Sequence, residues 1–147
     1  MKPLPHTYTV RIAAGPTGHA TLTSPGVADL PTAPPLEFDG SGDAWSPEQL
    51  LLAAVASCFL LTFRAVAKHS RLEFTSVSIE SEGIVDHVDG RTRFTDVVLR
   101  PKVAVSAVAD THRVQRALEK AEVNCIVTAS LAARLTVEPA VTVREAA

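Results

Sequence analysis

The chain has 147 residues, and its 14 Lys and Arg against 16 Asp and Glu leave a net charge of −2. This length fits one domain that buries roughly two thirds of its unfolded surface, so we expect a single domain over residues 1–147. The basic residues are scattered, which argues against a nucleic-acid-binding surface.

The chain shows no clear signal for a membrane or for secretion. Its one uncharged apolar run, residues 50–63, is shorter than the ~20 residues that span a bilayer. The N-terminus, Met-Lys-Pro-Leu-Pro-His, carries no apolar block of a secretory signal. With two cysteines in this context, we expect a cytoplasmic protein whose thiols stay reduced unless they react.

The first elements are predicted from the alternation of apolar and polar residues and from the positions of Gly and Pro. Residues 7–13 alternate as a half-buried strand, a turn follows at 15–18, and residues 19–23 return as a second strand. Seven Pro and Gly residues between 25 and 45 predict a long loop, which is uncommon in compact domains unless it is functional or held by a partner.

A long central helix is predicted to begin at Ser46. Ser46 and Gln49 form a capping-box pattern, and Pro47 suits the first helical position. From Leu50 to Phe63 apolar side chains point in every direction around the helix, so we expect it to be buried on all sides. Cys58 lies in its middle.

The second half is predicted to contain strands, two helices and a final strand. Residues 74–83 and 93–105 form strands joined by a hairpin turn at Asp89-Gly90, with an interruption at Pro101. Asp110 caps a helix whose apolar stripe is Val114, Ala117, Leu118 and Ala121. A short helix over 126–133 and a strand over 135–143 follow. Because strands and helices occur in runs, the pattern favours an α+β fold with largely antiparallel sheets.

The two cysteines are the main candidates for chemistry. Cys58 could be a small apolar residue of a core helix, since free cysteine is often buried. Cys125 lies near the start of the predicted short helix, where N–H dipoles lower a thiol pKa. A metal site lacks any signature, because there is no Cys-x-x-Cys and the five histidines are dispersed. Residues 15–18 are too short for a phosphate loop.

Glu48 has both an ordinary and a functional interpretation. An acid in the first helical turn favours the helix dipole. If Glu48 instead serves a thiol site, ten residues of helix place it roughly 15 Å from Cys58 of its own chain. The thiol would then belong to another subunit.

Two segments resemble the OsmC/Ohr family of osmotically inducible and organic-hydroperoxide-resistance proteins. One is Ser-Pro-Glu-Gln-Leu-Leu-Leu-Ala-Ala-Val-Ala-Ser-Cys-Phe at 46–59, and the other is Ala-Leu-Glu-Lys-Ala-Glu-Val-Asn-Cys at 117–125. Arg-Phe-Thr at 93–95 also matches, and the resemblance covers about residues 34–139.

The resemblance implies a peroxidase without metal or organic cofactor, on an intertwined homodimer with antiparallel sheets around a long central helix. Cys58 would attack an alkyl or lipid hydroperoxide and become a sulfenic acid, and Cys125 would resolve it as a disulfide. An external dithiol or a lipoylated reductant would reset the pair. Glu48 matches the family glutamate, which pairs with an arginine.

That arginine is missing from the expected segment, because no Arg or Lys lies between Arg11 and Arg64. His19 lies close to the family's position and is a titratable substitute. Arg11 and Arg64 are alternatives, although a strand surface and a helix C-terminus explain them. The absence supports a second hypothesis: an OsmC-like protein that binds an apolar ligand or senses oxidation without efficient turnover. A Cys58 pKa well below about 8.5 would favour the enzyme.

Overall fold

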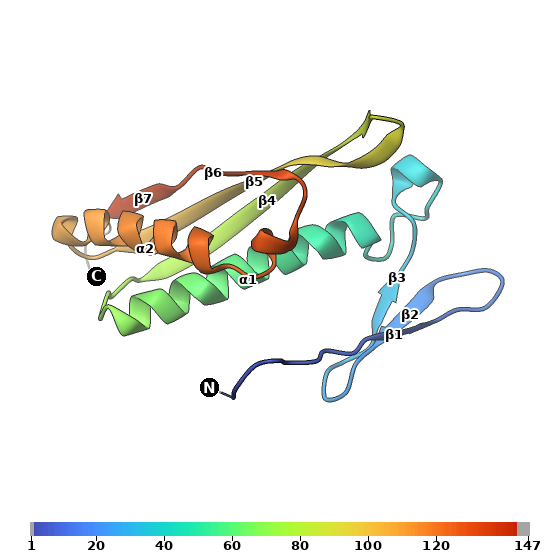
Figure 1. The fold of residues 1–147 in the computed structure, drawn as a ribbon, viewed down its shortest axis with the longest axis horizontal. Coiled ribbons are helices and arrows are strands. Elements are labelled where there is room, and N and C mark those ends of the chain that lie inside the picture. The colour runs from blue at the N-terminus through green and yellow to red at the C-terminus, as the bar shows by residue number, and fades with distance from the viewer. Residues whose placement is uncertain (1, 144–147) are drawn as a thin grey trace. The chain divides into compact units, whose positions relative to one another are not determined.

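The structure, a computed structural model, describes residues 2–143 (Figure 1). The chain divides between Leu51 and Leu52 into two compact units, called here the N-terminal unit and the C-terminal unit. That the whole chain acts as a single domain stays a prediction.

The N-terminal unit contains a small antiparallel sheet. Its strands are β1 (Arg11–Ala13), β2 (Ala20–Thr23) and β3 (Leu30–Thr32), in the order β1-β2-β3. The predicted half-buried strand over 7–13 is wrong in extent and burial, because only its end pairs with β2 and that end is exposed. The predicted loop over 25–45 is wrong in part, since it contains β3 and a 3-10 turn, Leu36–Phe38. Pro31 is tolerated because β3 is an edge strand.

The long helix α1 (Pro47–His69) begins where the sequence predicts. The Ser46 N–H donates to Gln49 Oε1 at 3.0 Å, and the Gln49 N–H donates to Ser46 Oγ at 3.2 Å. These reciprocal bonds confirm the capping box. The helix ends where Arg71 adopts a left-handed φ of 51° and the Leu72 N–H donates to the Ala67 carbonyl at 2.9 Å.

The prediction that the central helix is buried on all sides is wrong for the single chain. Val55, Phe59, Phe63 and Ala67 form one buried face, whereas Leu61 is 55% exposed. The sheet and second helix of the same unit cover only the buried face. With 23 residues and a mean hydropathy of 2.1, α1 could cross a membrane by length and composition alone. Its buried face belongs instead to a protein core.

Two long strands form the centre of the C-terminal unit. β4 (Ser76–Val88) and β5 (Arg91–Val105) pair antiparallel along their whole length. Asp89 and Gly90 have φ values of 53° and 73°, which confirms the predicted hairpin turn. Pro101 does not interrupt β5, contrary to expectation. Pro101 lies between the part of β5 that pairs with β6 and the part that pairs with β7. A residue at this position needs no N–H donor on that edge of β5.

The remaining elements are α2 (Thr111–Asn124), β6 (Arg134–Val137) and β7 (Ala140–Val143), with 3-10 turns at Val108–Asp110 and Thr128–Ser130. β6 and β7 both run parallel to β5, so this sheet is mixed, while the other strand pairings of residues 2–143 are antiparallel as expected. The predicted helix over 126–133 is wrong, since only the 3-10 turn forms. Asp110 occupies the N-cap position of α2 as predicted, but its side chain forms no capping hydrogen bond and binds Arg113 Nη1 at 2.6 Å.

The C-terminal unit has two layers, with α1 and α2 on one face of the sheet formed by β4, β5, β6 and β7 (Figure 1). Val114, Ala117, Leu118 and Ala121 are the buried residues of α2, as predicted. They form one core cluster with the buried face of α1 and with β5. The observed elements therefore form the predicted α+β fold.

Candidate functional site

Cys58 lies on α1 at the border between the buried and the exposed face. Its neighbours Val55 and Phe59 are fully buried, whereas Cys58 itself is half-buried. The thiol packs against the core of the C-terminal unit but retains access to solvent. This placement suits a nucleophile that needs both a fixed position and an approach path.

Cys125 ends α2 and is fully buried. Its extended backbone stops the helix and turns the chain into the 3-10 turn, where the Thr128 hydroxyl donates to the Cys125 carbonyl at 3.0 Å. α2 thus brings the second cysteine back to α1, where the Cys125 thiol is close enough to lower the pKa of Cys58. The two cysteines meet although 66 residues separate them in the chain.

The surroundings of Cys58 favour its thiolate. Burial opposes ionisation, but a hydrogen bond from the Val127 N–H outweighs it together with bonds from the Cys125 thiol and the Thr62 hydroxyl. The Ile126 N–H adds to them, and the net effect lowers the pKa of Cys58. These hydrogen-bond donors stabilise the Cys58 thiolate, a role that the sequence analysis assigned to a cation.

The surroundings of Cys125 have the opposite effect. Burial raises the pKa of Cys125, and its neighbour Cys58 raises it further, while hydrogen bonds from Thr128 oppose the change only in part. The sequence predicted a lowered pKa for Cys125 at a helix start, and that prediction is wrong. The N–H groups that follow Cys125 point to Cys58 instead. The two thiols therefore differ, with Cys58 the readier nucleophile.

Glu48 lies in the first turn of α1, within the N-terminal unit. Its Oε2 is buried and has no hydrogen-bond partner, and Glu48 forms no ion pair with any residue between 2 and 143. It borders a cavity of about 350 Å³ whose other walls are mainly small or apolar, including Ile12, Ala20, Ala33 and Phe38. A buried acid oxygen without a donor is costly, so this cavity calls for a donor group from elsewhere.

His19 lies beside a different acid from the one that the sequence suggested. Its Nε2 is 2.9 Å from Asp43 Oδ1, and the Ser41 hydroxyl also donates to Asp43. The Ser41 bond and then His19 lower the pKa of Asp43. Arg11 and Arg64, the other candidate cations, are exposed and form no ion pair among residues 2–143.

Sequence reasoning missed the donors around Cys58. Thr62 carried a usable signal, because a hydroxyl four residues after a helical cysteine shares its face. The Ile126 and Val127 N–H groups carried none, since backbone donors are not encoded by residue type. Within residues 2–143, no group of three or more His, Cys, Asp or Glu side chains is arranged to hold a metal ion.

Comparisons with known proteins identify the family and the fold of this chain. The family model described as "OsmC-like protein" matches residues 40–140. An organic hydroperoxide resistance protein of Xanthomonas axonopodis pv. citri is 31% identical over 120 residues, covering 74% of this chain and 82% of its own length. The uncharacterized protein YmaD of Bacillus subtilis is 32% identical over 100 residues, 66% of this chain and 67% of its own length.

A solved structure shares the fold. The OsmC-like protein of unknown function VCA0330 from Vibrio cholerae superposes with a TM-score of 0.85 at 20% identity, covering 92% of this chain and 99% of that protein. At this level of identity the similarity concerns the fold alone.

Proposed function

The chain belongs to the OsmC-like family, and on this premise we propose that it is a thiol-dependent peroxidase that reduces organic hydroperoxides. Peroxidase-like activity is a role named among its relatives, which include the hydroperoxide resistance protein and a peroxiredoxin OsmC of Escherichia coli. The observation that carries the proposal is the pair of neighbouring thiols, in which Cys58 has a lowered pKa and Cys125 a raised one.

The proposed reaction has three balanced steps. The Cys58 thiolate attacks the terminal oxygen of ROOH, the O–O bond breaks, and the alkoxide takes a proton to leave as ROH. The Cys125 sulfur then attacks the Cys58 sulfenic acid, which forms the disulfide and releases water. An external dithiol, free or lipoylated, reduces the disulfide by two exchange steps and is itself oxidised to a disulfide.

The asymmetry of the thiols fits this order of events. A thiolate is needed for the first attack, and the lowered pKa of Cys58 increases its thiolate fraction. Cys125 is buried and waits next to the sulfur that will be oxidised, which favours trapping before over-oxidation. A Cys58 pKa measured well below about 8.5 would favour an enzyme over a binding protein without turnover.

The rim of the site supports an organic substrate. Ile126, whose N–H contacts Cys58, is 69% exposed, and Leu61 on the next turn of α1 is 55% exposed. Apolar side chains beside a thiol favour an alkyl or lipid group over hydrogen peroxide, because burying the alkyl group removes apolar surface from water.

The direct test counts the free thiols that remain after cumene hydroperoxide is added. One equivalent of peroxide added to the reduced protein without external reductant is expected to remove both thiols and to leave one disulfide between Cys58 and Cys125. Thiol titration and peptide mapping measure this result. A protein that retains both thiols while peroxide is unchanged would contradict the proposal.

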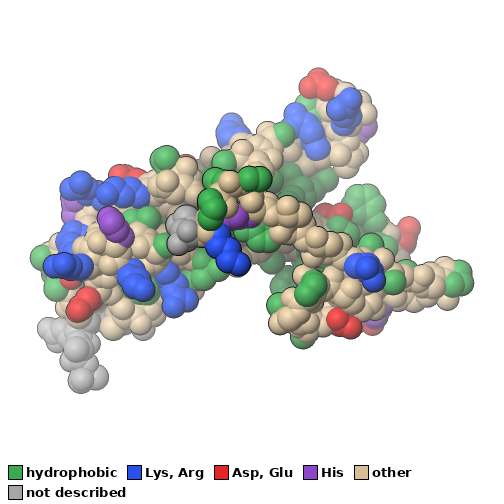
Figure 2. Space-filling model, turned by 60° about the horizontal axis from the view of Figure 1, so that its bottom comes forward, with side chains coloured by type: hydrophobic (Ala, Val, Ile, Leu, Met, Phe, Trp, Pro, Cys, Tyr) green, Lys and Arg blue, Asp and Glu red, His purple; other side chains and the backbone are tan. Residues whose placement is uncertain are grey.

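We also propose that the active protein is a homodimer in which the partner subunit supplies Glu48 to the thiol site. The N-terminal unit supports this, because Ala33 is its only buried apolar residue between 2 and 51. Tyr8, Ile12 and Phe38 are 81%, 59% and 57% exposed, and apolar surface is visible on this unit at the right of Figure 2. A unit of this size without a core of its own needs another protein surface to cover its exposed apolar side chains.

Sedimentation equilibrium tests the dimer and is expected to return twice the chain mass of 15.6 kDa. Ile12→Lys should shift the equilibrium toward the monomer, since a charge would enter an apolar contact. Val123→Lys, at an 82% exposed position of the C-terminal unit, is the matched control. A wild-type mass of one chain at micromolar concentration would overturn the dimer.

The location and the partners follow from the same chemistry. We infer a cytoplasmic protein, because the cycle needs a compartment that keeps free thiols reduced.

His19 as the titratable group that supports the site remains a prediction, and in this structure it pairs with Asp43. The chemistry requires no metal or organic cofactor.

A further inference from the structure

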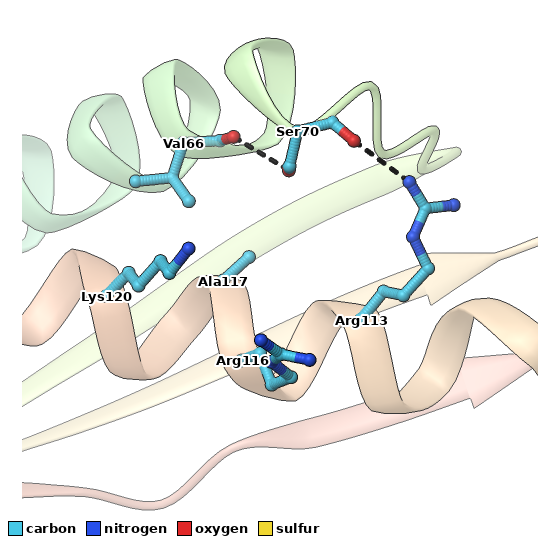
Figure 3. A pocket seen from close by; sticks show the side chains of 6 residues that line it. All are labelled: Val66, Ser70, Arg113, Arg116, Ala117 and Lys120. Carbon is cyan, nitrogen blue, oxygen red and sulfur yellow. Dashed lines mark hydrogen bonds between the residues drawn. The ribbon is translucent and has the colours of Figure 1, made fainter.

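A second pocket in the C-terminal unit lies where the end of α1 meets the first half of α2 (Figure 3). It has a volume of about 220 Å³ and is lined by Val66, Ser70, Arg113, Arg116, Ala117 and Lys120. Three of these six side chains are cations on one face of α2. Lys and Arg side chains also gather on this unit at the left of Figure 2.

Arg113 has a structural role in this pocket. Its Nη1 donates to Asp110 at 2.6 Å, and its Nη2 donates to the carbonyls of Ser70 and Arg71 at 3.0 and 2.9 Å. These carbonyls lie at the end of α1, where the helix itself supplies no N–H donors to them. Arg113 therefore joins the two helices and neutralises Asp110.

Arg116 and Lys120 have no such partners. Neither side chain forms an ion pair or a hydrogen bond with any residue between 2 and 143. They are four residues apart on the helix, where like charges repel each other. Figure 3 shows the Lys120 side chain reaching across toward Val66 of α1. Two unneutralised cations beside the apolar Val66 and Ala117 form a site for the acidic end of an amphiphile.

The same pair of helices carries the thiols at its other end. α1 and α2 run antiparallel, because Ser70 meets Arg113 at one end and Cys58 meets Cys125 at the other. Lys120 is five residues before Cys125, about 7.5 Å along the axis, and Val66 is eight residues after Cys58, about 12 Å. These axial separations are within the length of a long-chain acyl group, so an amphiphile held at Lys120 is long enough to extend to the thiols.

We propose, building on the peroxidase function above, that Arg116 and Lys120 bind the carboxylate of an amphiphilic hydroperoxide whose peroxide group reaches Cys58. The preferred substrates are then hydroperoxides of free long-chain acids, in place of neutral alkyl hydroperoxides. Val66 and Ala117 contact the first part of the aliphatic chain. Arg116 and Lys120 are specificity residues and take no part in the redox steps.

The test compares linoleic acid hydroperoxide with its methyl ester, which carries the same peroxide group and chain but no negative charge. Wild type is expected to prefer the acid by about tenfold in kcat/KM, mainly through KM, from charge-assisted hydrogen bonds. In Arg116→Gln/Lys120→Gln this ratio should fall to near one. Arg91→Gln/Lys102→Gln changes the same charge at exposed positions of β5 and should keep the wild-type ratio. A wild-type ratio near one, or equal losses in both double variants, would overturn the proposal.

A binding measurement separates this proposal from the peroxidase itself. Decanoate and decanol are titrated into the reduced protein, and amide NMR shifts along α2 are followed. Saturable shifts near Arg116 with decanoate alone, lost in Arg116→Gln/Lys120→Gln, would support the carboxylate site even if peroxide turnover failed. Equal responses to both compounds, or decanoate binding that survives in the double variant, would refute it.

Discussion

Cys58→Ser is expected to lower the rate of organic hydroperoxide reduction by roughly 10³-fold or more, the scale of loss when a covalent nucleophile is removed. A serine hydroxyl is not ionised near neutral pH and cannot form a sulfenic acid, so the first step has no substitute. Stopped-flow consumption of cumene hydroperoxide in a single turnover measures the effect. Wild-type consumption by Cys58→Ser would rule out Cys58 as the reacting group.

The pH dependence of the wild-type rate provides an internal check. The rate should rise with pH as the Cys58 thiol ionises, with a midpoint below the ~8.5 of an ordinary cysteine, because its pKa is lowered. Below the midpoint the thiol is neutral and slow, and above it the rate levels off. A midpoint above that ordinary value would favour a binding or sensing protein.

Cys125→Ser should separate the first turnover from the later ones. Its single-turnover rate stays close to that of wild type, because Cys58 is still present. Repeated additions of peroxide with a dithiol should then inactivate the variant, since the sulfenic acid has no neighbouring thiol and proceeds to sulfinic acid. The intrachain disulfide is lost as well.

Mass spectrometry of Cys58 follows this second prediction directly. Wild type should show the disulfide after one equivalent of peroxide, and Cys125→Ser should show added oxygen on Cys58 instead. Thr111→Ala, which removes a hydroxyl that donates to the Val108 carbonyl at the opposite end of α2, is the matched structural control and should keep the disulfide. Sustained turnover by Cys125→Ser with no oxygen added would show that Cys125 is not the resolving residue.

Local rules predicted the elements whose hydrogen bonds close within a few residues. The capping box at Ser46 and Gln49 joins neighbours in the chain, and the Asp89-Gly90 turn needs only positive φ values that such residues allow. The same rules failed where tertiary contacts compete. Asp110 has a cap residue's identity, but its carboxylate binds Arg113, and the residues after Cys125 form one 3-10 turn in place of a helix.

The sequence by itself predicted a cysteine nucleophile on a long apolar helix and a second cysteine at the end of an amphipathic helix, and it determined the family to which both motifs point. Only the tertiary structure decided how Cys58 is activated. The donors to its sulfur include the N–H groups of Ile126 and Val127, which reach α1 because α2 folds back against it on the sheet. A backbone donor has no residue type of its own, so its direction is known only once the chain is folded.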